Sequence, residues 1–268
     1  MNEFRDTETR FRRRLWQQWI NPAGHSVPVF LVGCGRSGTS MLVRHLSRSW
    51  KTDLYNEDHP GAFQKWRLRE LSVVEALLKR TNAPFVLFKP ILDTYRTHVL
   101  ISRFPDAKVI FAFRHFDDVI NSSLKRFGIS NRLNHVNSWI TDDFREFSSA
   151  PPPEKTKELV RSKWTPSLTP QSGAALYWLF QNQLFFDLEL CLDNRVKLVR
   201  YESVVGDSVN EFNKLCQFLG LDFEERIAEG VFSHSVGRDK PPEIDAHIRT
   251  DCDALWLRLC EHVSLGYE

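Results

Sequence analysis

The sequence has few cysteines and no spacing that is typical of a metal site. Its 268 residues include five cysteines, an odd number, and no two of them form a C-x-x-C pair. Neither a disulfide framework nor a zinc site is therefore supported. The better interpretation is that these residues are small buried thiols in a reducing compartment, and no metal is expected.

Long apolar runs and a strong charge imbalance are also missing. No run is long enough to span a bilayer, and the first twenty residues lack the apolar segment of a secretory signal. With 36 basic and 34 acidic residues, the formal net charge is +2, which argues against a protein that wraps around a nucleic acid. The sequence therefore predicts a cytoplasmic protein without a transmembrane segment, and a local positive pocket for a small anion is compatible with its overall charge.

The N-terminal residues predict an amphipathic helix. Phe11, Leu15 and Trp19 fall on one stripe, and several arginines occupy the other faces. Such a helix can lie on a membrane, but docking on its own domain or on a partner subunit is the preferred interpretation. The oligomeric state stays open.

Short apolar runs alternate with helical patterns along most of the chain. Strands are predicted at Val29–Cys34, Asp53–Tyr55, Phe85–Lys89, Lys108–Phe113 and Arg195–Val199. Because strands that alternate with helices pair in parallel, the expected fold is of the α/β class, with a central parallel sheet flanked by helices in a three-layer sandwich.

Helices are predicted between these strands, at residues 38–50, 63–79 and 115–127. Another is expected to start at Ser208, which has a capping-box spacing to Glu211. We expect residues 1–268 to form one domain. Within it, residues 129–172 have a weak pattern and several prolines, so they are interpreted as a lid or insertion, with a disordered surface excursion as the alternative.

The strongest local signal is the glycine-rich segment Gly33–Ser40, which follows a predicted strand and opens a predicted helix. Glycines let the backbone turn tightly and bring its N–H groups close to an anion, and a helix N-terminus adds free donors. Compared with the pattern G-x-x-x-x-G-K-[ST] of nucleotide triphosphatases, Gly33 and Gly38 match but Thr39 replaces the lysine. That replacement counts against hydrolysis of ATP or GTP.

Two segments of this chain resemble the motifs of the PAPS-dependent sulfotransferases. The loop core Arg36–Ser40 is similar to their donor-binding sequence [KR]-S-G-T-[ST]. In their second motif an arginine ends a later strand and a serine follows eight positions on, as Arg114 and Ser122 do here with Asp118 between them. Phe116 replaces the proline that this motif often contains, so the local turn is expected to differ.

Two later segments extend the resemblance over most of the chain. Val199–Ser203 (VRYES) is similar to the family's late strand that ends in Tyr-Glu, and Cys216–Leu221 (CQFLGL) is similar to the helix end that follows it. Both lie in the expected order after the donor motifs, so the matches together run from about Val29 to Leu221.

The resemblance implies that the three-layer sandwich is of the P-loop type. It also implies a donor site for PAPS, with PAP as the product. The 3′-phosphate would be held by Arg114 and Ser122, and the adenine would lie near Tyr201. Arg238 and Lys240 are candidate extra ligands from a C-terminal loop. The 5′-phosphosulfate would be held by Gly35, Arg36, Ser37, Gly38, Thr39 and Ser40.

Sulfuryl transfer depends on positioning and charge stabilisation more than on covalent help. Arg36 and Lys89 are the candidate cations at the departing phosphate. Lys89 is chosen because a comparable lysine recurs in parts of the family. The alternative for Lys89 is a surface residue at a strand end. Many cytosolic members have a Lys-Thr-His segment here, but this chain has Lys89-Pro90-Ile91 and lacks that histidine.

An acceptor hydroxyl needs a general base. Tyrosylprotein sulfotransferases are among the members that use a glutamate about twenty residues past the donor loop, and Glu57 lies 21 residues after Arg36. Glu57 is therefore the predicted base, with Asp58 and His59 as rivals. The alternative for all three is a polar turn before a helix.

The acceptor is expected to be a small molecule with a hydroxyl group, either apolar or a carbohydrate. An apolar helix rich in aromatic residues is predicted at residues 173–192, and Trp139 and Trp164 precede it. Some of these aromatic side chains would line such a pocket, although most are expected to be core. Two other functions stay open: a P-loop kinase or nucleotide hydrolase, and a non-catalytic nucleotide-binding protein on the same fold.

Overall fold

The computed structural model describes residues 2–141, 151–232 and 236–265, with side chains from residue 11 onward. Its centre is a five-stranded sheet of order β2-β5-β1-β6-β7. All neighbouring pairs in this sheet are parallel. The strands are β1 (Val27–Gly33), β2 (Thr52–Tyr55), β5 (Phe85–Phe88), β6 (Lys108–Phe113) and β7 (Val196–Arg200).

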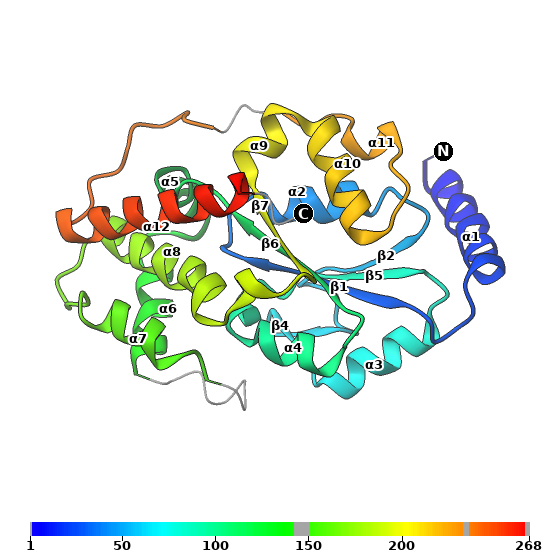
Figure 1. Cartoon of the computed structure of the whole chain (residues 1–268), viewed down its shortest axis with the longest axis horizontal. Helices are drawn as coiled ribbons and strands as arrows, with labels where there is room; N and C mark the ends of the chain where they lie inside the picture. Colours follow the sequence, from blue (N-terminus) through cyan, green and yellow to red (C-terminus); the bar gives the residue numbers. More distant parts are fainter. Residues whose placement is uncertain (1, 142–150, 233–235, 266–268) are drawn as a thin grey trace.

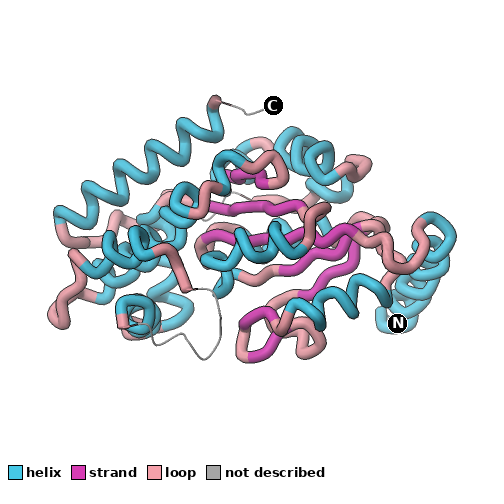
Figure 2. The backbone as a smooth tube through the Cα atoms, turned by 60° about the horizontal axis from the view of Figure 1, so that its bottom comes forward, coloured by secondary structure: helices cyan, strands magenta, loops and turns pink. Residues whose placement is uncertain are grey.

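Helices cover both faces of this sheet (Figures 1 and 2). On one face the core contains α2 (Thr39–Leu46), α9 (Tyr201–Gly206), α10 (Ser208–Leu219) and α11 (Glu225–Ala228). On the other, the long apolar α8 (Pro170–Asp187) and the C-terminal α12 (Ala246–Ser264) pack together with several shorter helices. These are α3 (Leu71–Arg80), α4 (Thr97–Arg103), α5 (Phe116–Phe127), α6 (Asn131–Ile140) and α7 (Glu154–Arg161).

The alternation of strand side chains explains the two cores. In β1, Phe30 and Val32 belong to the core under α8, while Val29 and Leu31 belong to the core under α2 and α10. All four are buried, as expected of a parallel strand that is covered on both faces. The predicted three-layer α/β sandwich with a central parallel sheet is thus confirmed.

The helix predicted at residues 63–79 is wrong in its first part. Residues 63–68 form an antiparallel hairpin of β3 (Phe63–Gln64) and β4 (Arg67–Leu68), and helix α3 begins only at Leu71. The buried Asp93, in the 3₁₀ helix η1 (Ile91–Arg96), accepts a hydrogen bond from the backbone N–H of Leu68 at 2.7 Å. This contact comes from 25 residues further along the chain, so local periodicity carries no sign of it.

The cap of α10 also differs from the prediction. The carboxylate of Asp207, not the hydroxyl of Ser208, accepts the backbone N–H of Asn210. Helix α5 matches its predicted limits: it is capped by His115 and ends at Gly128, whose φ is 81°. Its first turn contains Asp117 and Asp118, where the helix dipole favours negative charge.

A lid or insertion is predicted at residues 129–172. The described part of this segment, residues 129–141 and 151–172, contains α6, α7 and the start of α8. Both α6 and α7 pack on α8, and the buried Trp139 stacks on Phe180 with ring centroids 3.9 Å apart. Residues 142–150 lie outside the described part of the chain. The described helices are therefore joined to the core, and a lid role stays a prediction, as does the single-domain organisation.

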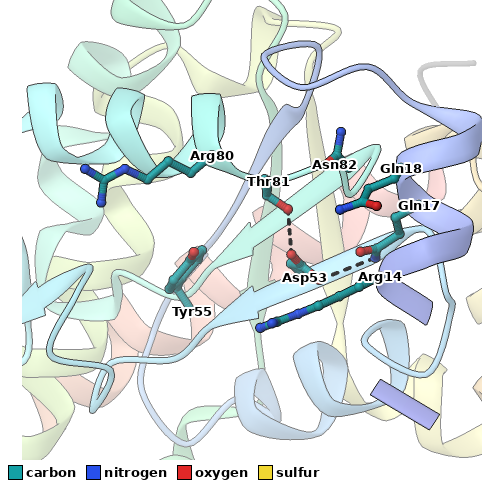
Figure 3. A pocket seen from close by; sticks show the side chains of 8 residues that line it. All are labelled: Arg14, Gln17, Gln18, Asp53, Tyr55, Arg80, Thr81 and Asn82. Atoms are coloured by element: carbon teal, nitrogen blue, oxygen red, sulfur yellow. Dashed lines mark hydrogen bonds between the residues drawn. The ribbon is translucent and has the colours of Figure 1, made fainter. Parts of the chain in front are cut away.

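The N-terminal helix α1 (Asn2–Ile20) docks on the edge of the sheet at β2. Gln17 is buried and donates to the carbonyl oxygen of Trp50 at 2.8 Å, and Trp16 meets the ring of Trp50 edge-on. Figure 3 shows the polar pocket between α1, β2 and the end of α3, where Asp53 accepts a hydrogen bond from Thr81. Of the two preferred interpretations, docking on its own domain or on a partner subunit, the first is thus observed.

Candidate active site

A cavity of about 500 Å³ opens beyond the carboxyl ends of β1, β5 and β6. Ligands of open α/β sheets commonly bind at this edge. The cavity brings together segments that are far apart in the sequence: the glycine-rich loop, the residue after β5, the residue after β6, and parts of α5, α6, α8 and α9. Its wall therefore combines most of the residues that were selected from the sequence.

The two matched glycines of the loop are required by its backbone. Gly33 has a φ of 111°, and a Cβ built there would lie 2.2 Å from the carbonyl oxygen of Ala112 in β6. Gly38 has a φ of 77°, and its Cβ would lie 2.3 Å from the ring of Tyr201. Arg36, between them, also has a positive φ of 76°, a strained conformation of the kind that gathers at functional sites. The loop then leads directly into α2.

Predicted donor-site residues from two elements meet at this loop. Arg36 Nε donates to Ser122 Oγ of α5 at 2.9 Å, and both residues line the cavity. Burial lowers the pKa of Arg36, and the positive charges of Arg126, Arg132 and Arg114 lower it further. Several cations thus surround the loop, which makes the site favourable for a multiply charged anion.

Arg114 lies immediately after β6 and is 5% exposed. It forms a salt bridge with Asp118 at 2.9 Å, and its guanidinium lies 4.5 Å from the centre of the Tyr201 ring. Asp118 also accepts the backbone N–H of Gly237. Arg114 thus pairs with an acidic residue at the start of α5, which is a structural role, but it also lines the cavity together with Ser122.

Glu57 and Lys89 form a second charged pair in the wall. Glu57 Oε2 lies 2.7 Å from Lys89 Nζ, which also donates to Ser40 Oγ at 3.0 Å. Lys89 is 5% exposed, so the alternative of a surface lysine does not describe it. Burial raises the pKa of Glu57, and the charge of Lys89 opposes that rise.

The rivals of Glu57 point elsewhere. Asp58 and His59 are exposed and do not line the cavity. Asp58 accepts a hydrogen bond from Asn56, and His59 Nδ1 accepts the backbone N–H of Gly61. Of the three candidates for the base, Glu57 alone lies in the wall of this cavity.

Three predicted ligands lie outside the wall. Ser37 is fully buried within the loop. Arg238 and Lys240 belong to a segment that runs along α5: the carbonyl oxygen of Lys240 accepts from Asn121, and Asp239 pairs with Lys125 at 2.6 Å. Their roles as ligands stay predictions. The remaining predicted residues, Gly35, Gly38, Thr39, Ser40 and Tyr201, do line the cavity.

Sequence reasoning missed a group of residues on the far side of the loop. Trp66, at the tip of the β3–β4 hairpin, and Arg132, on α6, both line the cavity, and neither belongs to a motif. Arg126 and Phe127 come from the end of α5. From the apolar helix α8 only Tyr177 reaches the wall, while Trp178, Phe180 and their neighbours are core, as expected for most of them.

The described residues contain no group of three or more histidine, cysteine, aspartate or glutamate side chains that would hold a metal ion. Within the same part of the chain, no helix has the length and apolar character needed to cross a membrane.

Comparison with known proteins identifies the family. The sulfotransferase domain family matches residues 27–238, which is most of the chain. The chain belongs to the sulfotransferase family. The predicted membership of the sulfotransferase family is thus confirmed. The function that goes with the family, transfer of a sulfuryl group, is confirmed with it. A search of curated proteins found no match to this sulfotransferase.

Solved structures share its fold at low sequence identity. The sulfotransferase domain of the curacin biosynthetic pathway is 15% identical, with a TM-score of 0.51, and the match covers 86% of this chain and 98% of that one. The sulfotransferase domain of the olefin synthase of Synechococcus PCC 7002 is 17% identical, with a TM-score of 0.50, over 89% of this chain and 96% of that one. A mouse sulfotransferase in complex with PAP is 16% identical, with a TM-score of 0.47, over 88% and 89%.

Proposed function

We propose that this sulfotransferase moves the sulfuryl group of PAPS to the hydroxyl group of a small acceptor. The observation that carries the proposal is the contact between two features of one cavity: the Glu57–Lys89 pair, a base and a cation, is joined through Lys89 to Ser40 of the anion-binding loop. A base for the acceptor and a cation for the leaving group thus lie beside the phosphate-binding backbone.

The donor would bind along the loop. Backbone N–H groups of residues 35–40 and the start of α2 would hold the 5′-phosphosulfate, as helix N-termini commonly hold phosphates. Arg114 and Ser122 would hold the 3′-phosphate, since a guanidinium and a hydroxyl suit a dianion. Tyr201, which lies against Gly38 and under Arg114, would support the adenine side of the nucleotide.

The reaction would proceed by direct displacement at sulfur. The acceptor oxygen forms a bond to sulfur while the bond from sulfur to the bridging oxygen of the 5′-phosphate breaks. Glu57 accepts the proton that the hydroxyl loses, and PAP leaves with the negative charge on its 5′-phosphate. Lys89 and Arg36 stabilise that charge, and their positions are fixed before the reaction, which is the source of such electrostatic catalysis. The fixed Glu57–Lys89 contact also orients the base.

Calorimetric titration with PAP, ADP and ATP, each with and without magnesium, tests the donor site. Binding of PAP that is tighter than that of ADP and independent of magnesium is the expected result. Preference for ATP with magnesium would contradict the proposal and favour the P-loop kinase or hydrolase. Tight PAP binding with no transfer to any acceptor would instead favour a non-catalytic nucleotide-binding protein.

A further inference from the structure

Arg132 is a buried cation in the cavity wall that the donor site does not use. It is 4% exposed and forms no ion pair with any carboxylate in the described part of the chain. Its guanidinium lies 3.9 Å from the centre of the Tyr177 ring and 4.7 Å from that of Phe127. Nη2 reaches Ser123 Oγ only at 3.5 Å, and the buried Nε has no hydrogen-bond partner.

A buried charge in this state is unfavourable unless an opposite charge completes the site. Aromatic faces offset only part of the cost of removing a guanidinium from water. They also hold its plane in place, which prepares it for two parallel hydrogen bonds to a planar anion. The missing partner of Arg132 is therefore expected to come from a ligand.

Arg132 and Tyr201 contact different ends of the loop. The Gly38 end of the loop faces Tyr201, whose ring lies against the guanidinium of Arg114. The Gly35 end faces other residues: a Cβ on Gly35 would lie 3.3 Å from Arg132 Nη2 and 3.9 Å from Tyr177 Oη. Arg132 is thus beside the Gly35 end of the loop, whereas Tyr201, which we assign to the adenine side of the nucleotide, is beside the Gly38 end.

The residues around Arg132 also indicate the chemistry of the rest of the ligand. Trp66 is 59% exposed and Phe127 is 44% exposed, and both line the same cavity. Aromatic faces of this kind accept the flat or apolar side of a ring. Glu57 is the single acidic residue of the wall as described, so the far end of the cavity is positive.

We infer that the acceptor carries an anionic group, a carboxylate attached to an aromatic or sugar ring, and that Arg132 binds it while the ring lies against Trp66 and Phe127. This inference rests on the proposed function and deepens it, because it names the class of acceptor: hydroxyl compounds that are also acids. Arg132 acts as a specificity residue that selects these acids over neutral analogues of the same shape.

The test uses two matched pairs of probes and the full chain saturated with PAP. One pair is 4-nitrophenyl β-D-glucuronide and 4-nitrophenyl β-D-glucoside, and the other is 4-hydroxyphenylacetate and 4-hydroxyphenylacetamide. Calorimetry should show that the acid of at least one pair binds about tenfold or more tightly than its neutral partner, as expected for a charge-assisted contact. With PAPS, kcat/KM should show the same preference.

In Arg132→Gln the preference should fall to about threefold or less, while the dissociation constants for PAP and for the neutral partner stay within about twofold. Arg132→Lys should keep part of the preference, because it retains the charge without the fork. Arg161→Gln, on α7 and outside the cavity wall, is the matched control for loss of a positive charge. Thermal melting of each variant reports whether it is folded.

Three results would overturn the inference. The first is that the wild type binds the acid and its neutral partner equally. The second is that the PAP-loaded protein binds none of the probes. The third is that Arg132→Gln loses as much affinity for PAP as for the acid. The last would assign Arg132 to the donor. Failure of the wild type to bind PAP at all would instead contradict the proposed function, so the two failures are distinguishable.

Discussion

Glu57 Oε2 lies 2.7 Å from Lys89 Nζ, and both side chains are largely withdrawn from solvent. Lys89 contacts the loop through Ser40, so one short chain of contacts links the carboxylate to the anion-binding backbone. Lys89 directly follows β5 and Glu57 lies in the turn after β2. Because β2 and β5 are parallel neighbours in the sheet, their pairing brings the two side chains together. The fold thereby determines the separation between the Glu57 carboxylate and the glycine-rich loop.

The first prediction concerns Glu57 as the general base. Glu57→Gln keeps the shape of the side chain but cannot accept a proton, so turnover should fall by about 10²–10⁴. The dissociation constant for PAP, measured by calorimetry, should change little. Asp58→Asn is the matched control, since Asp58 is exposed and outside the cavity. Retained turnover in Glu57→Gln would move the role to Asp58 or His59.

The second prediction concerns pH. Burial raises the pKa of Glu57, and Lys89 opposes that rise. A base acts only when deprotonated, so kcat/KM should decrease as the pH falls through a pKa above the ordinary glutamate range. Removal of the opposing charge in Lys89→Met should shift this decrease of the residual activity to higher pH. A decrease that persists in Glu57→Gln would show that another group titrates.

The third prediction concerns the 3′-phosphate. Arg114→Ala should weaken PAP binding by about 10–100-fold, in the range of a hydrogen bond to a charged group. Binding of adenosine 5′-monophosphate, which lacks the 3′-phosphate, should change much less. Ser122→Ala should act in the same direction with a smaller effect. Equal losses for both nucleotides would mean that Arg114 acts mainly through its structural pair with Asp118.

The fold and the glycine-rich loop of the candidate site were largely predictable from the sequence. The apolar runs that became β1, β5 and β6 report burial on both faces, a property that each run carries by itself. Gly33 and Gly38 were identifiable because their positions require a backbone conformation and a close approach that other residues resist. The roles assigned to Arg114 and Ser122 came from the family resemblance and stay predictions.

The part of the cavity that we propose for the acceptor was not predictable, because tertiary contacts create it. The turn of the β3–β4 hairpin has positive φ at Lys65 and Trp66, neither of which is a residue that favours such a turn. The hairpin is held instead by Asp93, through Leu68 and an ion pair with Arg67. Arg132 likewise reaches the cavity through the packing of α6 on α8, which no local pattern reports.

The last prediction concerns Gly33, at the start of the loop. Two properties favour glycine there, the positive φ and the close approach of β6, and a pair of variants separates them. A Cβ at Gly33 would meet Ala112, whose carbonyl oxygen and backbone nitrogen lie 2.2 and 2.9 Å away in the neighbouring strand β6. Neither atom moves without disturbing the β1–β6 register. Gly33→Ala should therefore destabilise the protein by about 1–3 kcal/mol as an overpacked site, which corresponds to a lowering of Tm by about 2–4 °C per kcal/mol.

Gly24→Ala is the matched control. Gly24 also has a positive φ, 89°, but a Cβ there would meet nothing within 4 Å. Its substitution therefore measures the cost of the backbone conformation alone. Thermal melting should show a larger loss for Gly33→Ala, and PAP affinity should fall in that variant only, because Gly24 lies outside the loop. Equal losses in Tm would mean that β6 yields to the added methyl group, and that backbone conformation by itself selects glycine at the start of this loop.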